Sequence, residues 1–322
     1  MVGIKDIAKK TGYSISTVSY ALNNSHKVSE ATRAIIIKAA DELHYVPNNA
    51  ARTLKRNQSN IIGVFLADYS GAFYGELLHG IKLQLQKENY EMIVCSGEQS
   101  HRFIPEKLID GAIILDAAFD DDEILRLADL DNNIVTMDRD IVHPRIGTVL
   151  LDNEGGTNAA LTQLGQYDEL PLYIVTGPEA SYDSQSRYKT AKRWASENKR
   201  EVNWIDGDFS RKSGQRAARQ ILSENSRYPI TVFSFNDEMA VGMYKVFAKT
   251  DLLIGRDIKM VGFDNIEIAS FLTPRLTTIG YSKYHWGIEA AKQIVAIIQN
   301  EDAAHKKVYT SLITGESLEK ES

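Results

Sequence analysis

Residues 4–23 read IKDIAKKTGYSISTVSYALN, and this stretch predicts two short helices joined by a tight connection. Apolar residues recur at helical spacing on both sides of the connection, at Ile4, Ile7, Ala8, Val18 and Leu22. Ser14 stands where its hydroxyl can accept a hydrogen bond from the first turn of the second helix. So short a connection sets two helices at a steep angle, and the stretch therefore predicts a helix-turn-helix.

A third helix is expected over residues 30–45, EATRAIIIKAADELHY, with Ser29 as its N-cap. Its apolar positions are expected to close a small core with the first two helices, through Ile35, Ala39 and Leu43. Pro47 would end this helix, because proline disfavours helical geometry in the residue before it.

Charge is divided unevenly along the chain. Residues 1–60 hold nine Lys and Arg against four Asp and Glu, a net charge of +5. The whole chain has 37 basic and 43 acidic residues, so the remainder carries −11. A basic head on an acidic body indicates a DNA-binding segment joined to a part with another role. A solvated charged face would explain scattered lysines but not this segregation.

A series of residues at fixed spacing runs through the head. Its members are Ile4 to Ala8, Ser14, Thr17 to Ser19, Leu22, Asn23, Val28, Ser29, Thr32, Arg33, Leu43, Tyr45, Pro47, Asn48, Ala51, Arg52 and Leu54. This series closely resembles the opening of the lactose/galactose repressor (LacI/GalR) family, and the resemblance extends over nearly the whole chain. It implies a DNA-binding transcriptional regulator with an all-α helix-turn-helix head, a hinge helix and a periplasmic-binding-protein-like body.

The resemblance places the second helix in the major groove, where residues near its N-terminus meet base edges. It implies base contacts by Ile15, Ser16 and Tyr20. It implies phosphate contacts that fix the register by Lys5, Ser14, Thr17, Asn23 and Ser29. Ile15 can make only apolar contact, most naturally with a thymine methyl. Relatives often carry a basic or imidazole side chain at position 20, so Tyr20 indicates a shifted operator; alternatively it packs on the head itself, and Ser16 is only a cap.

Residues 47–59 are expected to form a hinge helix or linker between the head, residues 1–46, and the body, residues 60–318. The segment is too short and polar to fold as an isolated helix. In the family it becomes helical when two copies meet over DNA and a leucine enters a base step of the minor groove. The resemblance assigns that wedge to Leu54, with Arg52 and Lys55 at the phosphates. The other interpretation is a flexible linker with one incidental leucine.

The body alternates short apolar runs with helical segments, which is typical of parallel sheets covered by helices on both faces. Its length suits two such subdomains, so we expect an α/β core of two doubly wound lobes facing each other across a cleft. The first lobe is expected at about 60–150 plus 280–305, and the second at about 151–279 plus 306–318.

Many apolar runs end in polar residues, where ligands bind in such folds. The resemblance implies that a small-molecule effector contacts Phe73, Tyr74, Asp138, Arg187, Phe209, Asn236 and Asp264. Aromatic faces beside an arginine, carboxylates and an amide suit a polyhydroxylated ring, although they also suit a nucleobase. Each acid, including the neighbouring Asp237, could instead cap the helix after its strand.

Two departures from the family limit this transfer. Thr190 and Ala191 replace the usual glycine and phenylalanine, so the geometry near Arg187 is expected to differ. A helix of the first lobe is replaced by the short segment HRFIPEK, residues 101–107. Its first residues could be surface, the edge of the ligand site or an interface.

Several classes of protein are opposed by the sequence. No apolar run approaches the roughly 20 residues of a membrane span, so no membrane association is expected. Cys95 is the only cysteine, so no internal disulfide can form, and a reducing cytoplasm is expected. The seven histidines show no metal-ligand spacing, and no nucleophile–base pair or phosphate-binding loop is present. We therefore expect neither a metal, nor a cofactor, nor an enzyme.

Operators for such heads are near-palindromes, so a homodimer on double-stranded DNA is expected. The chain ends without a leucine heptad, and nothing in it supports a coiled-coil tetramer. Together these features predict a repressor of a carbohydrate-utilisation operon, controlled by a sugar in the cleft. The alternatives are a repressor with a purine-type corepressor and a catabolite regulator that uses a phosphorylated protein partner.

Overall fold

The computed structural model describes residues 2–46, 58–67, 73–225 and 227–318. The chain divides into two compact units, residues 1–59 and residues 60–322. Three residues expected to contact DNA from the hinge, Arg52, Leu54 and Lys55, lie outside the described residues.

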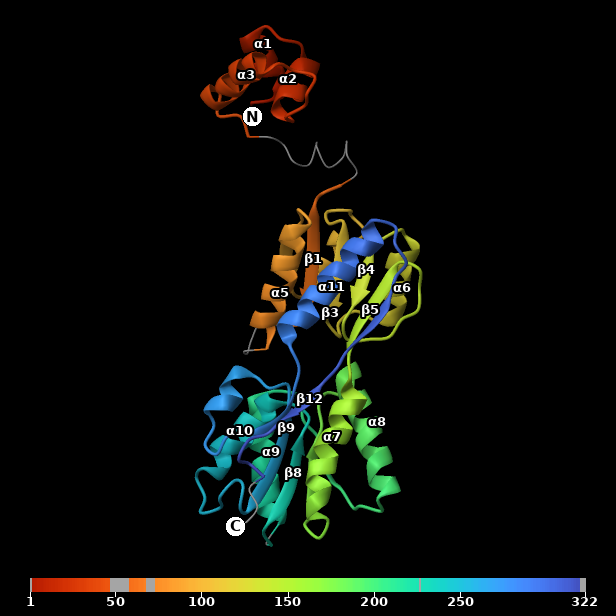
Figure 1. The fold of residues 1–322 in the computed structure, drawn as a ribbon, viewed down its shortest axis with the longest axis vertical. Helices are drawn as coiled ribbons and strands as arrows, with labels where there is room; N and C mark the ends of the chain where they lie inside the picture. Colours follow the sequence, from red (N-terminus) through yellow and green to blue (C-terminus); the bar gives the residue numbers. More distant parts are fainter. Residues whose placement is uncertain (1, 47–57, 68–72, 226, 319–322) are drawn as a thin grey trace. The chain divides into compact units, whose positions relative to one another are not determined.

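The first unit contains a head of three helices, α1 (Ile4–Thr11), α2 (Ile15–Leu22) and α3 (Glu30–Glu42) (Figure 1). Gly12 has a φ of +72°, a conformation that glycine adopts without strain, and it turns the chain directly after α1. The Ser14 hydroxyl accepts a hydrogen bond from the Thr17 N–H at 3.1 Å and so caps α2. The predicted helix-turn-helix is confirmed.

All three helices of the head meet at a small apolar core. Its buried members are Ile7, Val18, Ala21, Val28, Ile36, Ala39 and Ala40. The expectation that Ile35 lies in this core was wrong, because Ile35 is 52% exposed whereas Ile36 is fully buried. Residues 35–37 are three successive isoleucines, so the apolar pattern fits more than one helical register.

The third helix ends earlier than expected, at Glu42 rather than near residue 45. His44 adopts a left-handed φ of +51°, and the Tyr45 N–H donates to the Ala40 carbonyl at 2.9 Å. This bond is the one that closes a Schellman turn at a helix C-terminus. A local C-cap therefore ends α3 before Pro47 can act.

The first lobe of the body is a six-stranded parallel sheet in the order β11-β5-β4-β3-β1-β2. Its strands are β1 (Ile61–Leu66), β2 (Glu91–Cys95), β3 (Gly111–Leu115), β4 (Ile134–Thr136), β5 (Ile146–Leu151) and β11 (His305–Val308). Its helices are α5 (Tyr74–Lys87), α6 (Asp121–Asp129), α11 (Lys283–Ile298) and the 3₁₀ helix η1 (Glu98–Phe103).

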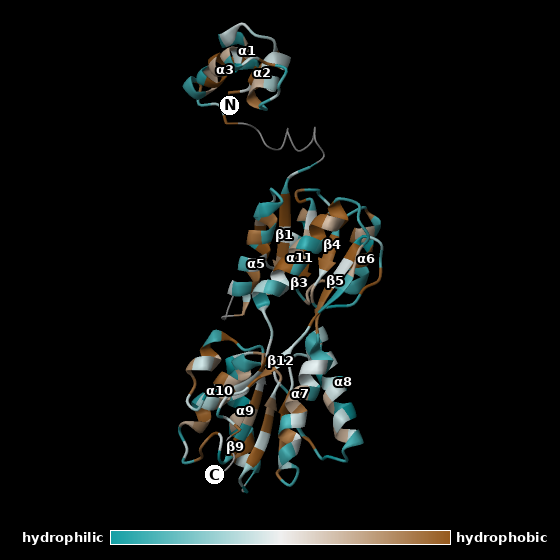
Figure 2. Ribbon diagram, in the orientation of Figure 1, coloured by the Kyte–Doolittle hydropathy of each residue, from teal (hydrophilic) through white to brown (hydrophobic). Residues whose placement is uncertain are grey.

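Successive residues of these strands point to opposite faces of the sheet, and each face has its own core. Val64 packs with Leu77 and Trp286, from α5 and α11, on one face. Phe65 packs with Ile124 of α6 on the other face. Figure 2 shows the strands as the most apolar part of the lobe, as expected for a sheet covered on both sides.

The second lobe repeats this design in a sheet of order β12-β10-β9-β8-β6-β7, in which only β12 is antiparallel. Its strands are β6 (Leu172–Val175), β7 (Asn203–Ile205), β8 (Ile230–Ser234), β9 (Ile258–Phe263), β10 (Thr277–Gly280) and β12 (Ser311–Ile313). Its helices are α7 (Asn153–Leu164), α8 (Tyr182–Glu197), α9 (Arg211–Glu224), α10 (Asp237–Phe247) and the 3₁₀ helices η2 (Gly165–Tyr167) and η3 (Glu267–Phe271). The expected core of two doubly wound lobes is confirmed.

The chain passes between the lobes three times, at Asp152, at residues 281–282 and at residues 309–310. Two of these crossings are hydrogen-bonded to each other. The Asp152 N–H donates to the Val308 carbonyl at 2.9 Å, and the Thr310 hydroxyl donates to the Asp152 carbonyl at 3.2 Å. The last crossing follows β11, whereas the expected division at residues 305 and 306 would cut this strand.

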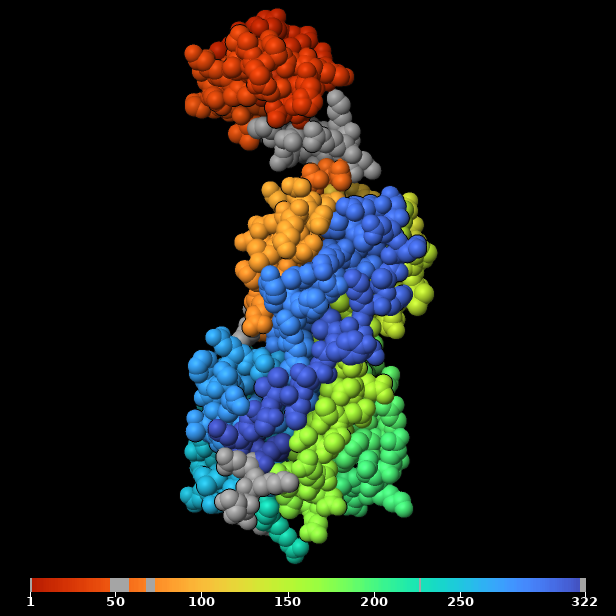
Figure 3. All heavy atoms as spheres, in the orientation of Figure 1, coloured from red at the N-terminus to blue at the C-terminus, as the bar shows by residue number. Residues whose placement is uncertain are grey.

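Two helices from opposite ends of the body lie side by side in the first lobe, α5 and α11, coloured orange and blue in Figure 3. Glycines allow their backbones to approach closely. A Cβ atom on Gly80 would lie 2.1 Å from the Tyr284 carbonyl oxygen, and one on Gly287 would lie 2.3 Å from the Leu77 carbonyl oxygen. The start of α5 is thereby fixed against the chain that enters α11 from the second lobe.

Candidate functional site

The residues expected to contact DNA from the head form an accessible surface around α2. Ile15 is 51% exposed and Tyr20 is 40% exposed, although both are large apolar side chains. The polar members of the set are likewise exposed, apart from the half-buried Thr17: Lys5, Ser14, Ser16, Asn23 and Ser29. The exposed side chains on this surface are accessible to a partner.

The alternative for Tyr20 and Ser16 is a purely structural role within the head. The Lys27 ammonium lies 5.1 Å from the centre of the Tyr20 ring, within the range of a cation–π contact. Tyr20 therefore lies beside a basic group and still keeps much of its surface exposed. The N-cap hydrogen bond belongs to Ser14, whose hydroxyl also lies 3.0 Å from the Ser16 hydroxyl.

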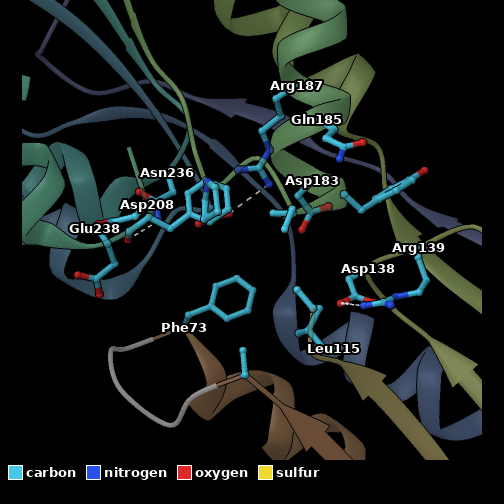
Figure 4. Close-up of a pocket in the computed structure, with 18 of the residues that line it drawn as sticks. Phe73, Leu115, Asp138, Arg139, Asp183, Gln185, Arg187, Asp208, Asn236 and Glu238 are labelled. Atoms are coloured by element: carbon cyan, nitrogen blue, oxygen red, sulfur yellow. Dashed lines mark hydrogen bonds and ion pairs between the residues drawn. The ribbon is translucent and has the colours of Figure 1, made fainter. Parts of the chain in front are cut away.

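A cavity of about 630 Å³ lies in the body and takes its walls from both lobes (Figure 4). The structure brings all seven expected effector contacts to this cavity, namely Phe73, Tyr74, Asp138, Arg187, Phe209, Asn236 and Asp264. They come from the strand ends and helix starts of both lobes. This is where ligands bind in doubly wound folds.

Arg187 is almost completely buried and is held by several elements of the second lobe. Its Nε donates to the Asn153 Oδ1 at 2.8 Å, and its Nη1 donates to the Phe235 carbonyl. The guanidinium lies 3.6 Å from the centre of the Phe263 ring, and its Nη2 is 3.8 Å from the Asp264 Oδ1. The departures at residues 190 and 191 leave Arg187 in the cavity wall, because Thr190 and Ala191 are buried away from the cavity lining.

Asp264 follows β9 with a φ of +107°, a strained conformation for a residue with a side chain. The Tyr281 hydroxyl donates to its Oδ1 at 3.0 Å, and the Lys283 ammonium donates to its carbonyl. Burial raises the pKa of Asp264 to about 6, although Arg187 and Lys283 oppose this shift. Asp264 thus links the cavity to the crossing at residues 281–282.

Asp237, one residue beyond the expected contact Asn236, is fully buried and does not line the cavity. Its carboxylate accepts hydrogen bonds from the Thr278 hydroxyl at 2.7 Å and from the Ile266 N–H at 3.1 Å. Burial, with the charge of Asp264 second, raises the pKa of Asp237 to about 8. The capping role falls to Asn236, which accepts from the Met239 N–H at 2.9 Å.

Asp138 is paired with its neighbour Arg139 through two hydrogen bonds, of 2.9 Å from Nε and 3.0 Å from Nη2. Burial raises the pKa of Asp138, and Arg139 opposes the shift. The same guanidinium donates to the carbonyl of Phe119 and, at 2.8 Å, to that of Asp116. Arg139 therefore fixes both the carboxylate and the loop between β3 and α6.

Phe209 forms an aromatic wall of the second lobe and has a left-handed φ of +65°. The Asn236 Nδ2 donates to the Phe209 carbonyl at 2.9 Å and holds this conformation. A Cβ atom on Gly177 would lie 2.2 Å from the Phe209 ring, so the ring occupies space that only glycine leaves free. Strained backbone of this kind is found mainly at functional sites.

Sequence reasoning missed several cavity residues, notably Phe119, Asp121, Arg139, Asp183, Asp208 and Glu238. Four of them are carboxylates at or just before the start of a helix. Serine, aspartate or asparagine caps precede these helices, at Asp120, Ser181, Ser210 and Asn236. Those capping patterns were the signal that could have located them.

The short segment at residues 101–107 packs behind one wall of the cavity. The His101 ring stacks on the Phe119 ring, with the ring centres 3.5 Å apart and the planes 11° apart. The His101 Nδ1 lies 3.0 Å from the Glu123 Oε1. His101 therefore packs behind the cavity wall without lining the cavity, whereas Arg102 is exposed.

Within the described residues, no cluster of His, Cys, Asp and Glu is placed to hold a metal ion. In the same part of the chain, no helix has both the length and the apolar character needed to cross a bilayer.

Two family models match the chain. Residues 3–48 match the model described as bacterial regulatory proteins, lacI family, and residues 160–318 match a periplasmic binding protein-like domain. The HTH-type transcriptional repressor PurR of Aliivibrio fischeri strain MJ11 is 30% identical over 315 residues, which cover 94% of this chain and 93% of that protein.

Among solved structures, a sugar-binding transcriptional regulator of the LacI family from Enterococcus faecalis is 48% identical, with a TM-score of 0.78. The match covers 82% of this chain and 100% of that one. The lac repressor dimer bound to operator and the anti-inducer ONPF is 24% identical, with a TM-score of 0.85 and 99% of each chain covered. At that identity, the second likeness is evidence for the fold alone.

Proposed function

This chain belongs to the lacI family of bacterial regulatory proteins, and from that premise we propose that it represses a carbohydrate-utilisation operon under the control of a sugar. Like its relatives, it is a DNA-binding transcriptional repressor and not an enzyme. The sugar would bind in the cavity between the two lobes. A repressor of this kind acts on DNA in the cytoplasm.

In the head, the exposed face of α2 supports the proposed DNA contacts. Ile15 and Tyr20 would meet base edges in the major groove, and Ser16 would lie between them. Lys5, Ser14, Thr17, Asn23 and Ser29 would fix the register on the phosphates. Arg52, Leu54 and Lys55 would act from the hinge, in the minor groove and on its phosphates.

The composition of the cavity wall is the main observation that supports a sugar as the ligand. Aromatic rings of Phe73 and Phe209 face a cavity that also exposes carboxylates, an amide and an arginine. Carboxylates and amides can each bond two vicinal hydroxyls, while the apolar face of a sugar ring lies against an aromatic ring. The regulator that is 48% identical is a sugar-binding protein, whereas the PurR relatives are 30% identical.

A purine corepressor is the second candidate, because the relatives called PurR cover nearly the whole chain. A planar base would also stack on Phe73 or Phe209 and bond to Arg187 and Asp264. A phosphorylated protein partner is the third candidate, and it would require a binding surface outside the cavity.

We propose that two copies bind a near-palindromic operator, since a symmetric site needs a symmetric dimer. Sugar binding would change the angle between the lobes about the three crossings at residues 152, 281–282 and 309–310. This change would separate the two heads and weaken operator binding. Coupling of this type is typically about 1–3 kcal/mol.

The test is a band-shift titration on DNA upstream of the chain's own and neighbouring genes, with a panel of sugars and purines. We expect one sugar to release a specific complex. Tightening by a purine would establish the corepressor candidate instead. A specific complex that no small molecule affects would favour a protein partner. Absence of any sequence-specific complex at moderate salt would contradict the role of the head.

A further inference from the structure

The walls of the cavity carry an excess of negative charge. Six carboxylates line it, at Asp121, Asp138, Asp183, Asp208, Glu238 and Asp264. Among the described residues, two cationic side chains line it, Arg139 and Arg187. Two further arginines, Arg211 and Arg216, pair with Glu238 and Asp208 from outside the lining. Asp138, Asp183, Glu238 and Asp264 are also partly or fully shielded from solvent, so salt screens their fields less than it screens surface charges.

Helix N-termini, where doubly wound folds usually bind anions, are already supplied with carboxylates here. Asp121, Asp183 and Glu238 lie in the first turns of α6, α8 and α10. At α9 the Asp208 Oδ1 accepts from the N–H of the capping Ser210 at 2.9 Å. The positive ends of these four helices therefore face carboxylates of the chain itself and would not attract an anionic ligand.

The Arg139 guanidinium has no donor left for a ligand. A guanidinium has five N–H groups. Arg139 directs them to both oxygens of Asp138, to the carbonyls of Asp116 and Phe119, and to the Asp121 Oδ1 at 3.5 Å. This side chain thus neutralises its own neighbours and does not form a phosphate site.

Arg187 also has a carboxylate partner, Asp264, and it donates one hydrogen bond to Asn153 and one to the Phe235 carbonyl. Two of its five N–H groups remain to donate to a ligand hydroxyl or ring oxygen. Asp183 differs from the other acids. Its Oδ1 accepts from the Asn153 amide at 2.7 Å, and it has no cationic partner within the described part of the chain.

We propose that this cavity selects an uncharged ligand and excludes phosphorylated and other anionic forms, with Asp183 as the residue that sets this selectivity. The proposal rests on the proposed function only in naming a sugar as the uncharged ligand. A phosphorylated sugar would place a dianion among four shielded carboxylates. Three of these have arginine partners, whereas the charge of Asp183 is not offset by a cation in the described part of the chain. Placing like charges next to each other is costly, and we expect its affinity to be at least about a hundredfold weaker than that of its neutral parent.

The experiment is calorimetric titration of the full chain with matched pairs: ribose and ribose 5-phosphate, glucose and glucose 6-phosphate, fructose and fructose 6-phosphate, inosine and inosine monophosphate. Hypoxanthine is added as a further neutral ligand. In any pair that binds, we expect the neutral compound to bind and the phosphorylated compound not to bind. A phosphorylated member that binds as tightly as its parent would overturn the proposal and leave the sugar-repressor function standing. Binding of hypoxanthine alone would contradict the sugar function and support selection of an uncharged ligand.

Inorganic phosphate is a probe that requires no identified sugar. Asp183→Asn removes one charge and keeps an oxygen that can accept from Asn153. Glu154→Gln is the matched control, because Glu154 is exposed, pairs with Arg193 and does not line the cavity. Phosphate that binds to the basic head does so equally in the wild type and in both variants, so it does not affect the comparison.

At constant ionic strength we expect Asp183→Asn to bind phosphate on the order of tenfold more tightly than the wild type and Glu154→Gln. Thermal melting and calorimetry would both report this gain. Equal phosphate affinity in all three proteins would show that Asp183 does not repel anions and would overturn the proposal.

Discussion

At the scale of single residues, Arg187 shows how one side chain can serve both the cavity and the stability of the second lobe. Its contacts come from the start of α7, at Asn153, and from the end of β9, at Phe263 and Asp264. A buried ion pair contributes little net stability, but loss of one partner leaves the other charge unpaired. The charge of Asp264 is therefore less well compensated when Arg187 is lost, because Lys283 would then oppose the effect of burial on its pKa without the arginine.

Arg187→Met is expected to lower the free energy of unfolding by about 3 kcal/mol, because Asp264 loses its cationic partner. Arg193→Met provides a control on the same helix. Arg193 also pairs with an acid, Glu154, but both side chains are about half exposed. Its loss should change stability by less than about 1 kcal/mol. Urea denaturation of both variants is the measurement, and equal effects would contradict this assignment.

Asp237 should make the stability of the body depend on pH. Its pKa in the folded state is about 8, well above the usual 3.8, so the folded chain holds a proton that the unfolded chain releases. Stability is therefore greatest below pH 4 as far as this group is concerned, and it falls as the pH rises toward 8. The slope can reach about 1.4 kcal/mol per pH unit.

Asp237→Asn should remove this loss, because an amide of the same shape can accept from the Ile266 N–H and donate to the Thr278 hydroxyl oxygen without a titrating proton. We expect the variant to gain on the wild type as the pH rises from 5 to 8 in urea denaturation. The exposed residue Asp251, changed to Asn, should show no such trend. A constant difference between Asp237→Asn and wild type across this range would disprove the assigned titration.

At the scale of elements, α2 and the start of α1 are expected to divide the work of DNA recognition. Ile15→Ala should weaken operator binding by about 1–3 kcal/mol and leave the salt dependence unchanged, because it removes an apolar base contact. Lys5→Ala should reduce the salt slope by about one unit, because it removes a phosphate contact. Fluorescence anisotropy measured over a series of salt concentrations distinguishes the base contact from the phosphate contact. The same change in slope for both variants would refute this division.

The packing of α5 against α11 gives a second prediction at this scale. Gly80→Ala should lower the free energy of unfolding by about 1–3 kcal/mol, because the new Cβ meets the Tyr284 carbonyl. Gly75→Ala lies on the same helix with no atom within 4 Å of the added Cβ. It should be neutral or stabilising by up to about 1 kcal/mol. Urea denaturation of both variants is the measurement. An equal loss of unfolding free energy in the two variants would contradict the close approach of α5 and α11.

Most elements could be predicted because apolar period, caps and strand–helix alternation are local signals. The positions of particular side chains in the fold were harder to predict from the sequence. Nothing local tells Ile35 from Ile36, and only the approach of α1 and α2 decides between them. The family resemblance located Asp138 and Asp264, which follow strands. The caps Ser181 and Asn236 indicate only that helices begin near Asp183 and Glu238, and these two residues reach the cavity because the helices start beside it. Such convergence depends on the tertiary fold.

At the scale of the whole chain, the three crossings are the segments through which we propose that regulation acts. Tyr281 lies at one of them, donates to Asp264 in the cavity wall and packs against Trp286 in the first lobe. A ligand that contacts Asp264 thus acts directly on a segment that joins the lobes. This arrangement supports coupling between the cavity and the lobe angle.

The most direct test of this coupling is reciprocity. The sugar that releases the operator in the band shift would be titrated calorimetrically into the full chain, alone and saturated with operator DNA. We predict weaker sugar binding in the presence of operator, by the same factor by which the sugar weakens operator binding, in the range of about 5- to 150-fold. Equal sugar affinity with and without bound operator would contradict coupling between the cavity and operator binding.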